Sequence, residues 1–198
     1  MIEAALIMPF FMYLLFATID YGGLFRDYQS LTHVAQAGGR TAAIDGNQPD
    51  ADYATVVRMR RADVALPAGS VRRIVVWRAT DDGSGVPWRK GPASVVPPAC
   101  ATATTGSATY SCNVYTTSAG TIDPPASSAA WSNCANTSNP SRFWCPTSRK
   151  AAFQGANSPP DHLGIYIEVL HPFVTGAFGT AKLLAVQLVF TLEASTTQ

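Results

Sequence analysis

The four cysteines of this chain are its clearest candidates for covalent chemistry. Cys100, Cys112, Cys134 and Cys145 all lie in one segment, and no other cysteine occurs. An even number in a tight cluster favours disulfides, which imply an oxidising compartment. The spacings contain no C-x-x-C pair and the chain has only three histidines, so no zinc site, other metal or cofactor is expected. Pairing of sequence neighbours, 100 with 112 and 134 with 145, is the preferred pattern, and two other connectivities remain open.

Sites for acid–base, nucleophilic or nucleotide chemistry are not indicated. The sequence has no G-x-S-x-G, P-loop, H-E-x-x-H or dinucleotide-binding glycine pattern. His33 falls on the polar side of a predicted helix and His171 precedes Pro172, so surface or capping roles are expected for both. The net charge is +1 and charged residues make up 14% of the chain, which does not indicate a nucleic-acid partner. We therefore do not expect an enzyme.

Glu3 is unusual because it opens the most apolar stretch of the chain. The sixteen residues from Ala4 to Ile19 carry no charge. A helix of this length covers about 24 Å, against about 30 Å for the hydrocarbon core of a bilayer. Adding Met1, Ile2 and residues 21–25 makes a membrane span marginally long enough. Since no basic region precedes the stretch and no small-residue cleavage site follows it, it is expected to remain in the mature protein.

A carboxylate in an apolar helix needs a neutralising partner. The nearest available cation is the N-terminal amine of a neighbouring chain, if helices pack side by side with an axial stagger. Pro9 removes one backbone donor, which kinks or locally melts a helix and frees the carbonyl near Ala5. Met1, Glu3 and Pro9 are therefore candidate assembly residues, and their use requires a polymer.

Helical periodicity continues beyond Asp20, and Gly46 is expected to end the helix. The apolar stripe comprises Leu24, Tyr28, Leu31, Ala35, Gly38 and Ala42. The polar side comprises Arg26, Asp27, Gln29, His33, Gln36 and Arg40. One continuous helix would thus be lipid-like in its first half and amphipathic in its second.

Four glycines interrupt this helix: Gly22, Gly23, Gly38 and Gly39. Each costs about 1 kcal/mol relative to alanine in a helix interior. Either another helix approaches closely there, or the helix bends or loosens. Gly22 and Gly23 are added to the candidate assembly residues.

The remainder of the chain predicts a small mixed head. A short helix is expected over residues 50–64, with Asp50 or Asp52 as its cap. Strands are expected at residues 71–78, 164–171 and 183–192, because β-branched residues are enriched or alternate there. Together they would form a small antiparallel sheet.

Residues 91–160 differ in composition from both flanks. Between residues 91 and 146 only Asp123 and Arg142 are charged, and serine, threonine and proline are abundant. Such a segment buries little apolar surface by itself and needs its disulfides as staples. Its nearby aromatic side chains either anchor these loops on the sheet, the preferred interpretation, or grip a partner. They are Trp88, Tyr110, Tyr115, Trp131, Phe143 and Trp144.

The N-terminal residues resemble the TadE-like pseudopilins and pilins of tight-adherence (Tad) and related type IV pili. The resemblance covers about 43 residues: Glu3 to Pro9, Ile19 to Gly22, Gln29 to Leu31, and then Ala35, Gly38, Gly39, Arg40, Ala42 and Ala43. Residues 165–173 are also similar to the family's head. The resemblance implies cleavage of a precursor by a prepilin peptidase, a helix held in inner-membrane lipid before assembly, and burial of that helix in the fibre core afterwards. Both a processed N-terminus at Met1 and an uncleaved anchor starting there are compatible with an acid at position three.

The expected fold is α+β. Residues 1–46 form a long kinked helix, and residues 47–198 form a globular head on a small antiparallel sheet, with 91–160 as a disulfide-containing insertion. The expected function is that of a pilin in an extracellular type IV-like filament, with copies of itself, other pilins and the assembly machinery as partners. The alternatives are an adhesin-like minor pilin with a binding head and a single-pass membrane-anchored extracytoplasmic protein.

Overall fold

The computed structural model describes residues 2–62, 65–67, 69–79, 95–116, 129–151 and 160–193; at residues 2–6 and 130 only the backbone is described. The helices are α1 Ile2–Asp45, α2 Ala51–Ala62, α3 Pro98–Ala101 and α4 Ala129–Ser132, with 3₁₀ turns η3 Pro140–Trp144 and η4 Pro146–Ser148. The strands are β1 Val71–Ala79, β2 Cys112–Thr116, β3 His162–Pro172 and β4 Ala181–Thr191. The α+β prediction, with a long N-terminal helix and an antiparallel sheet, is confirmed.

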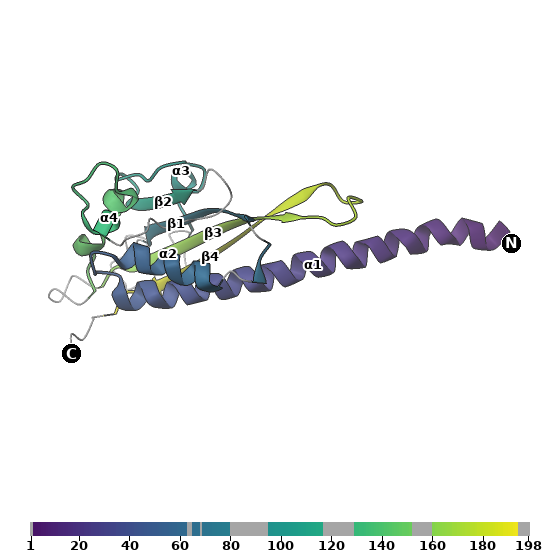
Figure 1. Ribbon diagram of the computed structural model, residues 1–198, viewed down its shortest axis with the longest axis horizontal. Helices are drawn as coiled ribbons and strands as arrows, with labels where there is room; N and C mark the ends of the chain where they lie inside the picture. The colour runs from purple at the N-terminus through teal and green to yellow at the C-terminus, as the bar shows by residue number, and fades with distance from the viewer. Residues whose placement is uncertain are drawn as a thin grey trace.

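Helix α1 is one unbroken element that extends far beyond the rest of the molecule (Figure 1). Pro9 lies inside it, so the proline does not melt the helix. The helix ends at Asp45 and is followed by Gly46, as predicted. A Cβ atom at Gly46 would lie 2.3 Å from the carbonyl oxygen of Ala42 and 2.2 Å from Leu192, so only glycine fits this turn.

The buried stripe of α1 is rotated from the predicted one at its start. Leu31, Ala35 and Ala42 are buried as expected, but Tyr28 is 46% exposed and its neighbour Asp27 is buried instead. A helix turns by about 100° per residue, so a shift of one position at residues 27 and 28 selects a different face. The assignment of Asp27 to the solvent side was therefore wrong.

The glycines in the second half of α1 permit close packing. A Cβ atom at Gly38 would lie 2.2 Å from the Met59 side chain of α2, so two helices do approach closely there. At Gly39 the nearest group is the ring of Phe190 on β4, at 1.9 Å. A Cβ atom at Gly22 would meet nothing within 4 Å, and at Gly23 it would lie 3.5 Å from His171. Close approach by a helix thus explains Gly38, and close approach by a strand explains Gly39.

The sheet has the strand order β2-β1-β3-β4, with antiparallel neighbours throughout. The three predicted strands are confirmed as β1, β3 and β4. β2 was not predicted, because its five residues, CNVYT, contain a single valine and lie in the polar insertion. It pairs with β1 at the edge of the sheet, so the insertion supplies part of the sheet itself.

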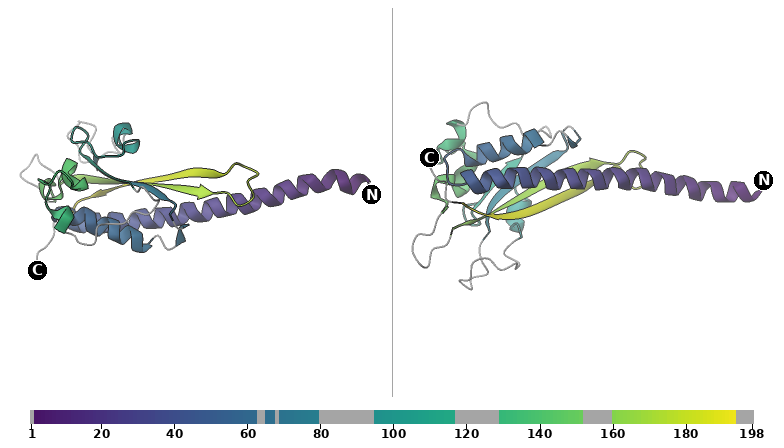
Figure 2. Two further views of the ribbon diagram at one scale, coloured as in Figure 1. Left: turned by 45° about the horizontal axis from the view of Figure 1, so that its top comes forward. Right: turned by 90° about the horizontal axis from the view of Figure 1, so that it is seen from below.

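The two faces of the sheet are covered by different parts of the chain (Figure 2). Helices α1 and α2 pack on one face, where Leu31 and Val56 join Ile165 and Ile167 in the larger core. The segment around α3 covers the other face, where Val96 and Cys100 pack with Val75 and Trp77. The β3–β4 hairpin extends past this covered region and runs along α1 (Figure 1).

Substituting alanine for Gly39 and for Gly22 is expected to have opposite effects on stability. Gly39→Ala must displace the Phe190 ring, and overpacking of this kind costs about 1–3 kcal/mol. Gly22→Ala meets open space in the monomer and is expected to be neutral or to stabilise by up to about 1 kcal/mol through helix propensity. Urea unfolding of the detergent-solubilised full chain, followed by tryptophan fluorescence, measures both. Equal midpoints for the two variants would contradict the close approach at Gly39.

Candidate functional site: an exposed apolar helix and its clamp

The first half of α1 projects from the head with its apolar side chains uncovered. Nine of the ten large hydrophobic residues between Ile7 and Ile19 are 45–64% exposed, and the tenth, Phe16, is partly buried. The nine exposed residues are Ile7, Met8, Phe10, Phe11, Met12, Tyr13, Leu14, Leu15 and Ile19. Exposed apolar patches of this extent mark contact with lipid or with another protein chain.

By length and composition α1 can cross a membrane. Its apolar window has a mean hydropathy of 1.4, and only 6% of that window is buried within the molecule. The predicted assembly residues Pro9 and Gly22 lie in this helix and are exposed. Glu3 also lies in α1, but its side chain is outside the described atoms, and Met1 is outside the described residues. The assembly roles of Met1, Glu3, Pro9, Gly22 and Gly23 therefore remain predictions.

Asp20 binds the tip of the β3–β4 hairpin at the end of the exposed segment. Its Oδ1 atom accepts hydrogen bonds from the backbone N–H groups of Val174 at 2.9 Å and Thr175 at 3.1 Å. The Thr175 hydroxyl donates to its Oδ2 atom. Asp20 is 1% exposed, so hydrogen bonds from the hairpin take the place of water around its carboxylate. It therefore clamps the hairpin to the helix.

A second acid of α1 binds the same hairpin. The Oδ2 atom of Asp27 lies 2.6 Å from Nδ1 of His171, and both side chains are buried. A surface or capping role for His171 was therefore wrong, because the ring packs between α1 and β3 at the point where the hairpin leaves the sheet. Asp20 and Asp27 are seven residues apart, which is two helical turns, so they share one face of α1.

Aromatic rings complete the contact between the hairpin and the helix. The ring of Phe178 lies 5.3 Å from that of Tyr13 and 5.2 Å from that of Tyr21, centroid to centroid. These distances are typical of tilted and edge-to-face aromatic pairs. The hairpin tip thus lies alongside the apolar part of α1 and extends toward the N-terminus of the helix.

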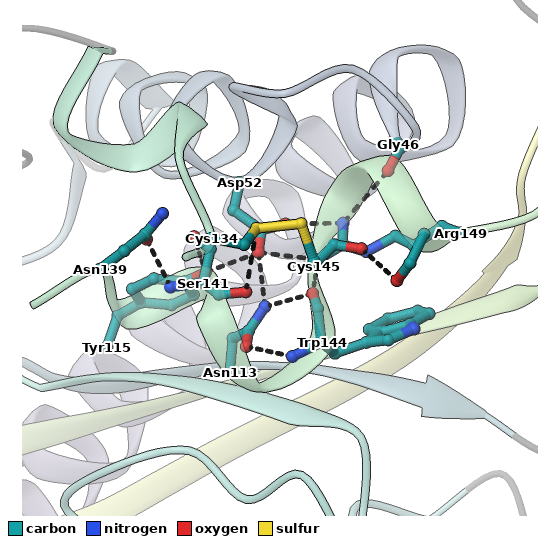
Figure 3. Close-up of polar contacts among 11 residues, drawn as sticks. Gly46, Asp52, Asn113, Tyr115, Cys134, Asn139, Ser141, Trp144, Cys145 and Arg149 are labelled. Atoms are coloured by element: carbon teal, nitrogen blue, oxygen red, sulfur yellow. Dashed lines mark hydrogen bonds and ion pairs between the residues drawn. A yellow bond between two sulfur atoms is a disulfide. The ribbon is translucent and has the colours of Figure 1, made fainter. Parts of the chain in front are cut away.

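At the opposite end of the head, a buried ion pair joins α2 to the insertion (Figure 3). Arg149 contacts Asp52 through two hydrogen bonds of 2.7 Å, and the side chains are 0% and 1% exposed. Asn113 and Tyr115 of β2 donate to the same carboxylate at 2.8 and 2.6 Å. The sequence predicted Asp50 or Asp52 as the cap of this helix. Asp52 lies inside the first turn of α2 instead, and its carboxylate binds these three side chains.

The insertion closes over this cluster. Trp144 accepts hydrogen bonds at its carbonyl oxygen from Asn113 at 2.8 Å and Arg149 at 3.0 Å, and the Arg149 guanidinium lies 4.3 Å from the Trp144 ring. Arg149 also donates to the carbonyl oxygen of Gly46, just after α1. Because its charges are paired and enclosed, the cluster holds structure together rather than presenting reactive groups to solvent.

Both disulfides form in the preferred pattern. Cys100 is bonded to Cys112 and Cys134 to Cys145, so the local connectivity is confirmed. The first bond fixes the α3 segment to β2, and the second braces the segment that carries η3. By restricting the unfolded chain, each disulfide that closes a loop of this size stabilises the fold by about 3 kcal/mol.

The aromatic residues of the insertion mostly anchor it. Tyr115, Trp131 and Trp144 are buried, and the rings of Tyr115 and Trp131 stack 4.8 Å apart. Tyr110 is 49% exposed. Trp88 lies outside the described residues. The anchoring interpretation is confirmed for the three buried residues.

Burial raises the pKa of the Tyr115 hydroxyl well above its ordinary value of 10.0, and the neighbouring Asp52 carboxylate raises it further. Tyr166 behaves similarly: burial, with a hydrogen bond to Glu168, raises its pKa to about 12. Both hydroxyls therefore stay protonated in the folded protein through most of the alkaline range.

Within the described part of the chain, no group of three or more His, Cys, Asp or Glu side chains could hold a metal ion. The buried acids Asp20, Asp27 and Asp52 all have partners within the protein. Most of the exposed large hydrophobic residues in the described part of the chain lie in α1. An apolar helix that projects from a sheet-based head fits a protein that is held in a membrane, or joined to other chains, through that helix.

The family model described as TadE-like protein matches residues 1–40. No curated protein and no solved structure matches the chain. The family match confirms the resemblance in the N-terminal residues and supports a TadE-like protein of the Tad pilus, over the segment that it covers. The family match and the exposed apolar helix together fit a subunit related to the Tad pilus. They also fit a structural role and an association with a membrane and a surface pilus.

Removing the cation of the buried pair is expected to destabilise the head strongly. Arg149→Met leaves the Asp52 carboxylate buried without its partner, which costs about 3–5 kcal/mol. Arg142→Met is the matched control, because Arg142 is exposed on the same segment, and it is expected to cost less than about 1 kcal/mol. Chemical denaturation of both variants measures the difference. A loss below about 1 kcal/mol for Arg149→Met would contradict the structural role of the pair.

The raised pKa of Tyr115 predicts a loss of stability in alkali. The folded pKa lies above the unfolded one, so the contribution is complete below about pH 10 and is lost as the pH rises toward the folded pKa. Tyr115→Phe is expected to be less stable at about pH 9 but to lose less stability than the wild type between about pH 9 and 11. Tyr110→Phe, at an exposed position, should keep the wild-type slope. Denaturation midpoints at both pH values test this, and identical slopes for Tyr115→Phe and wild type would refute it.

Proposed function

We propose that the protein is a pilin, the structural subunit of an extracellular type IV-like filament that assembles through α1. The observation that carries the proposal is the uncovered apolar half of this helix. Its side chains are exposed in the monomer although they match the composition of a helix surrounded by lipid or by other helices. Burial in a filament core removes this surface from water. The role is structural and not enzymatic.

Glu3 is proposed to bind the N-terminal amine at Met1 of a neighbouring subunit. A carboxylate at the head of an apolar helix is unfavourable in a low-dielectric core unless a cation offsets it. Axial stagger between packed helices supplies that cation. Pro9 and Gly22 support the same packing, because Pro9 frees a carbonyl acceptor and the open surface at Gly22 lets a second helix approach closely.

Before assembly, α1 is proposed to lie in inner-membrane lipid, with the disulfide-containing head on the oxidising side. A prepilin peptidase and the pilus assembly machinery are the proposed partners at this stage. Residues 1–46 then form the filament core, and residues 47–198 face outward. The disulfides agree with this placement, because they form outside reducing compartments.

The adhesin-like and single-pass alternatives predict different features: the first requires exposed binding residues, and the second requires no partner for Glu3. An adhesin that grips a surface through Trp131 or Trp144 has no support, because both side chains are buried. A single-pass anchored protein has no need of a paired Glu3. Recovery of the protein in extracellular filaments, with its N-terminus identified by mass spectrometry, would distinguish a pilin from a single-pass anchored protein.

Glu3→Ala and the isosteric Glu3→Gln are expected to leave extracellular filaments strongly reduced or absent, while subunits accumulate in the membrane. Removing one partner of a buried ion pair costs about 3–5 kcal/mol, here at each subunit contact. The measurement is the amount of subunit in sheared filaments against the amount in membranes, by immunoblot and electron microscopy.

Glu193→Gln is the control, since it removes an exposed carboxylate from the head. It should assemble as the wild type does. Intact disulfides in the Glu3 variants show that the head has folded. Normal filaments from Glu3→Gln would overturn the proposed pairing.

A further inference from the structure

The tip of the β3–β4 hairpin, residues 173–180, lies beside the apolar half of α1 (Figures 1 and 2). Its Phe178 ring contacts both Tyr13 and Tyr21. Tyr13 precedes Ile19 by six residues, which places it about 9 Å closer to the N-terminus along the helix axis. Any apolar layer that surrounds α1 as far as Ile19 therefore also reaches the level of the hairpin tip.

The composition of the tip suits such a layer. Residues 172–181, PFVTGAFGTA, contain no charged side chain. Val174 is 82% exposed, so the tip presents an apolar side chain that nothing in the monomer covers. Lys182 directly follows this uncharged stretch and is exposed. A cation at this position matches the headgroup level of an anionic membrane.

Most backbone amides of the tip donate hydrogen bonds within the protein. Unpaired N–H groups are costly in lipid, where no water replaces the missing partner. Five amides of the tip have protein acceptors, and two of them are held by the Asp20 carboxylate. The donors are Phe173, Val174, Thr175, Ala177 and Gly179, and the acceptors are, in the same order, Thr180, Asp20, Asp20, the Thr175 hydroxyl and Gly176.

We propose that the hairpin tip is a second membrane contact, which inserts into the outer interface of the bilayer that holds α1 before assembly. The inference rests on the proposed function, in which α1 lies in lipid at this stage. The offset of about 9 Å between Tyr13 and Ile19 is comparable to the depth at which interfacial amphipathic helices bury their apolar face, about 5–10 Å into the boundary between headgroups and acyl chains. Because Asp20 and the Asp27–His171 pair fix the hairpin to α1, this contact sets the depth and orientation of the whole head.

Single-cysteine labelling of the full chain in vesicles tests the inference. The native cysteines of the described residues are all in disulfides, so an added thiol can be labelled with the polarity-sensitive dye NBD. Val174→Cys reports on the tip, Phe11→Cys on the exposed half of α1, and Tyr110→Cys on an exposed head position away from the hairpin. The vesicles contain phosphatidylcholine and phosphatidylglycerol, with or without lipid that carries a doxyl quencher at acyl carbon 5.

The expected result is a blue-shifted emission and a loss of intensity in quencher-containing vesicles for Val174→Cys and Phe11→Cys, and neither change for Tyr110→Cys. Val174 is almost fully exposed, so labelling there leaves the fold intact, and retained disulfides verify this. If Phe11→Cys is quenched and Val174→Cys is not, the inference is overturned while the membrane-held helix stands. If neither is quenched, the membrane placement in the proposed function fails too. Val174→Cys chains that cross-link to one another and escape the lipid quencher would assign the tip to a second copy, which also overturns the inference.

Discussion

The packing of the second half of α1 against the sheet determines how the rest of the molecule is arranged. Leu31, Val34 and Ala35 are buried there, and Gly38 lets Met59 of α2 lie against the helix backbone. Because α1 is unbroken from Ile2 to Asp45, this docking also fixes the direction in which the apolar half projects. One rigid element thus serves as core in the head and as an interaction surface beyond it.

The contacts of the hairpin extend that rigid unit toward the N-terminus. Asp20 and Asp27 place two carboxylates on the head-facing side of α1, where each meets donors from the hairpin. Burial of an acid is unfavourable unless hydrogen bonds or a cation compensate for lost hydration, and both acids have such partners. The transition from the core-packed half to the uncovered half is therefore marked by polar locks rather than by a flexible joint.

Local features of the fold were predictable from the sequence, and long-range polar contacts were not. Strand-forming residues identify β1, β3 and β4, and Gly46 marks the end of α1, because these signals lie within a few neighbouring residues. Cysteine spacing indicated the disulfides for the same reason.

The clusters that lock the head join residues far apart in the chain. Asn113 and Asp52 are 61 residues apart, Arg149 and Asp52 are 97 apart, and His171 and Asp27 are 144 apart. A charged residue in a helix sequence has a solvent-facing position as its default, and only tertiary packing reveals that Asp27 or Asp52 is enclosed. The seven-residue spacing of Asp20 and Asp27 is the one feature of the sequence from which their common face on the helix could have been predicted.

The bond between Cys134 and Cys145 also makes the closed form of the head dependent on the redox state of its surroundings. It braces the segment that closes over Arg149 and Asp52, and Arg149 in turn binds the backbone just beyond α1. The full stability of this closed arrangement therefore depends on oxidation of both thiols. In a reducing compartment the segment that covers Asp52 and Arg149 would lack its covalent brace, right beside the C-terminal end of α1.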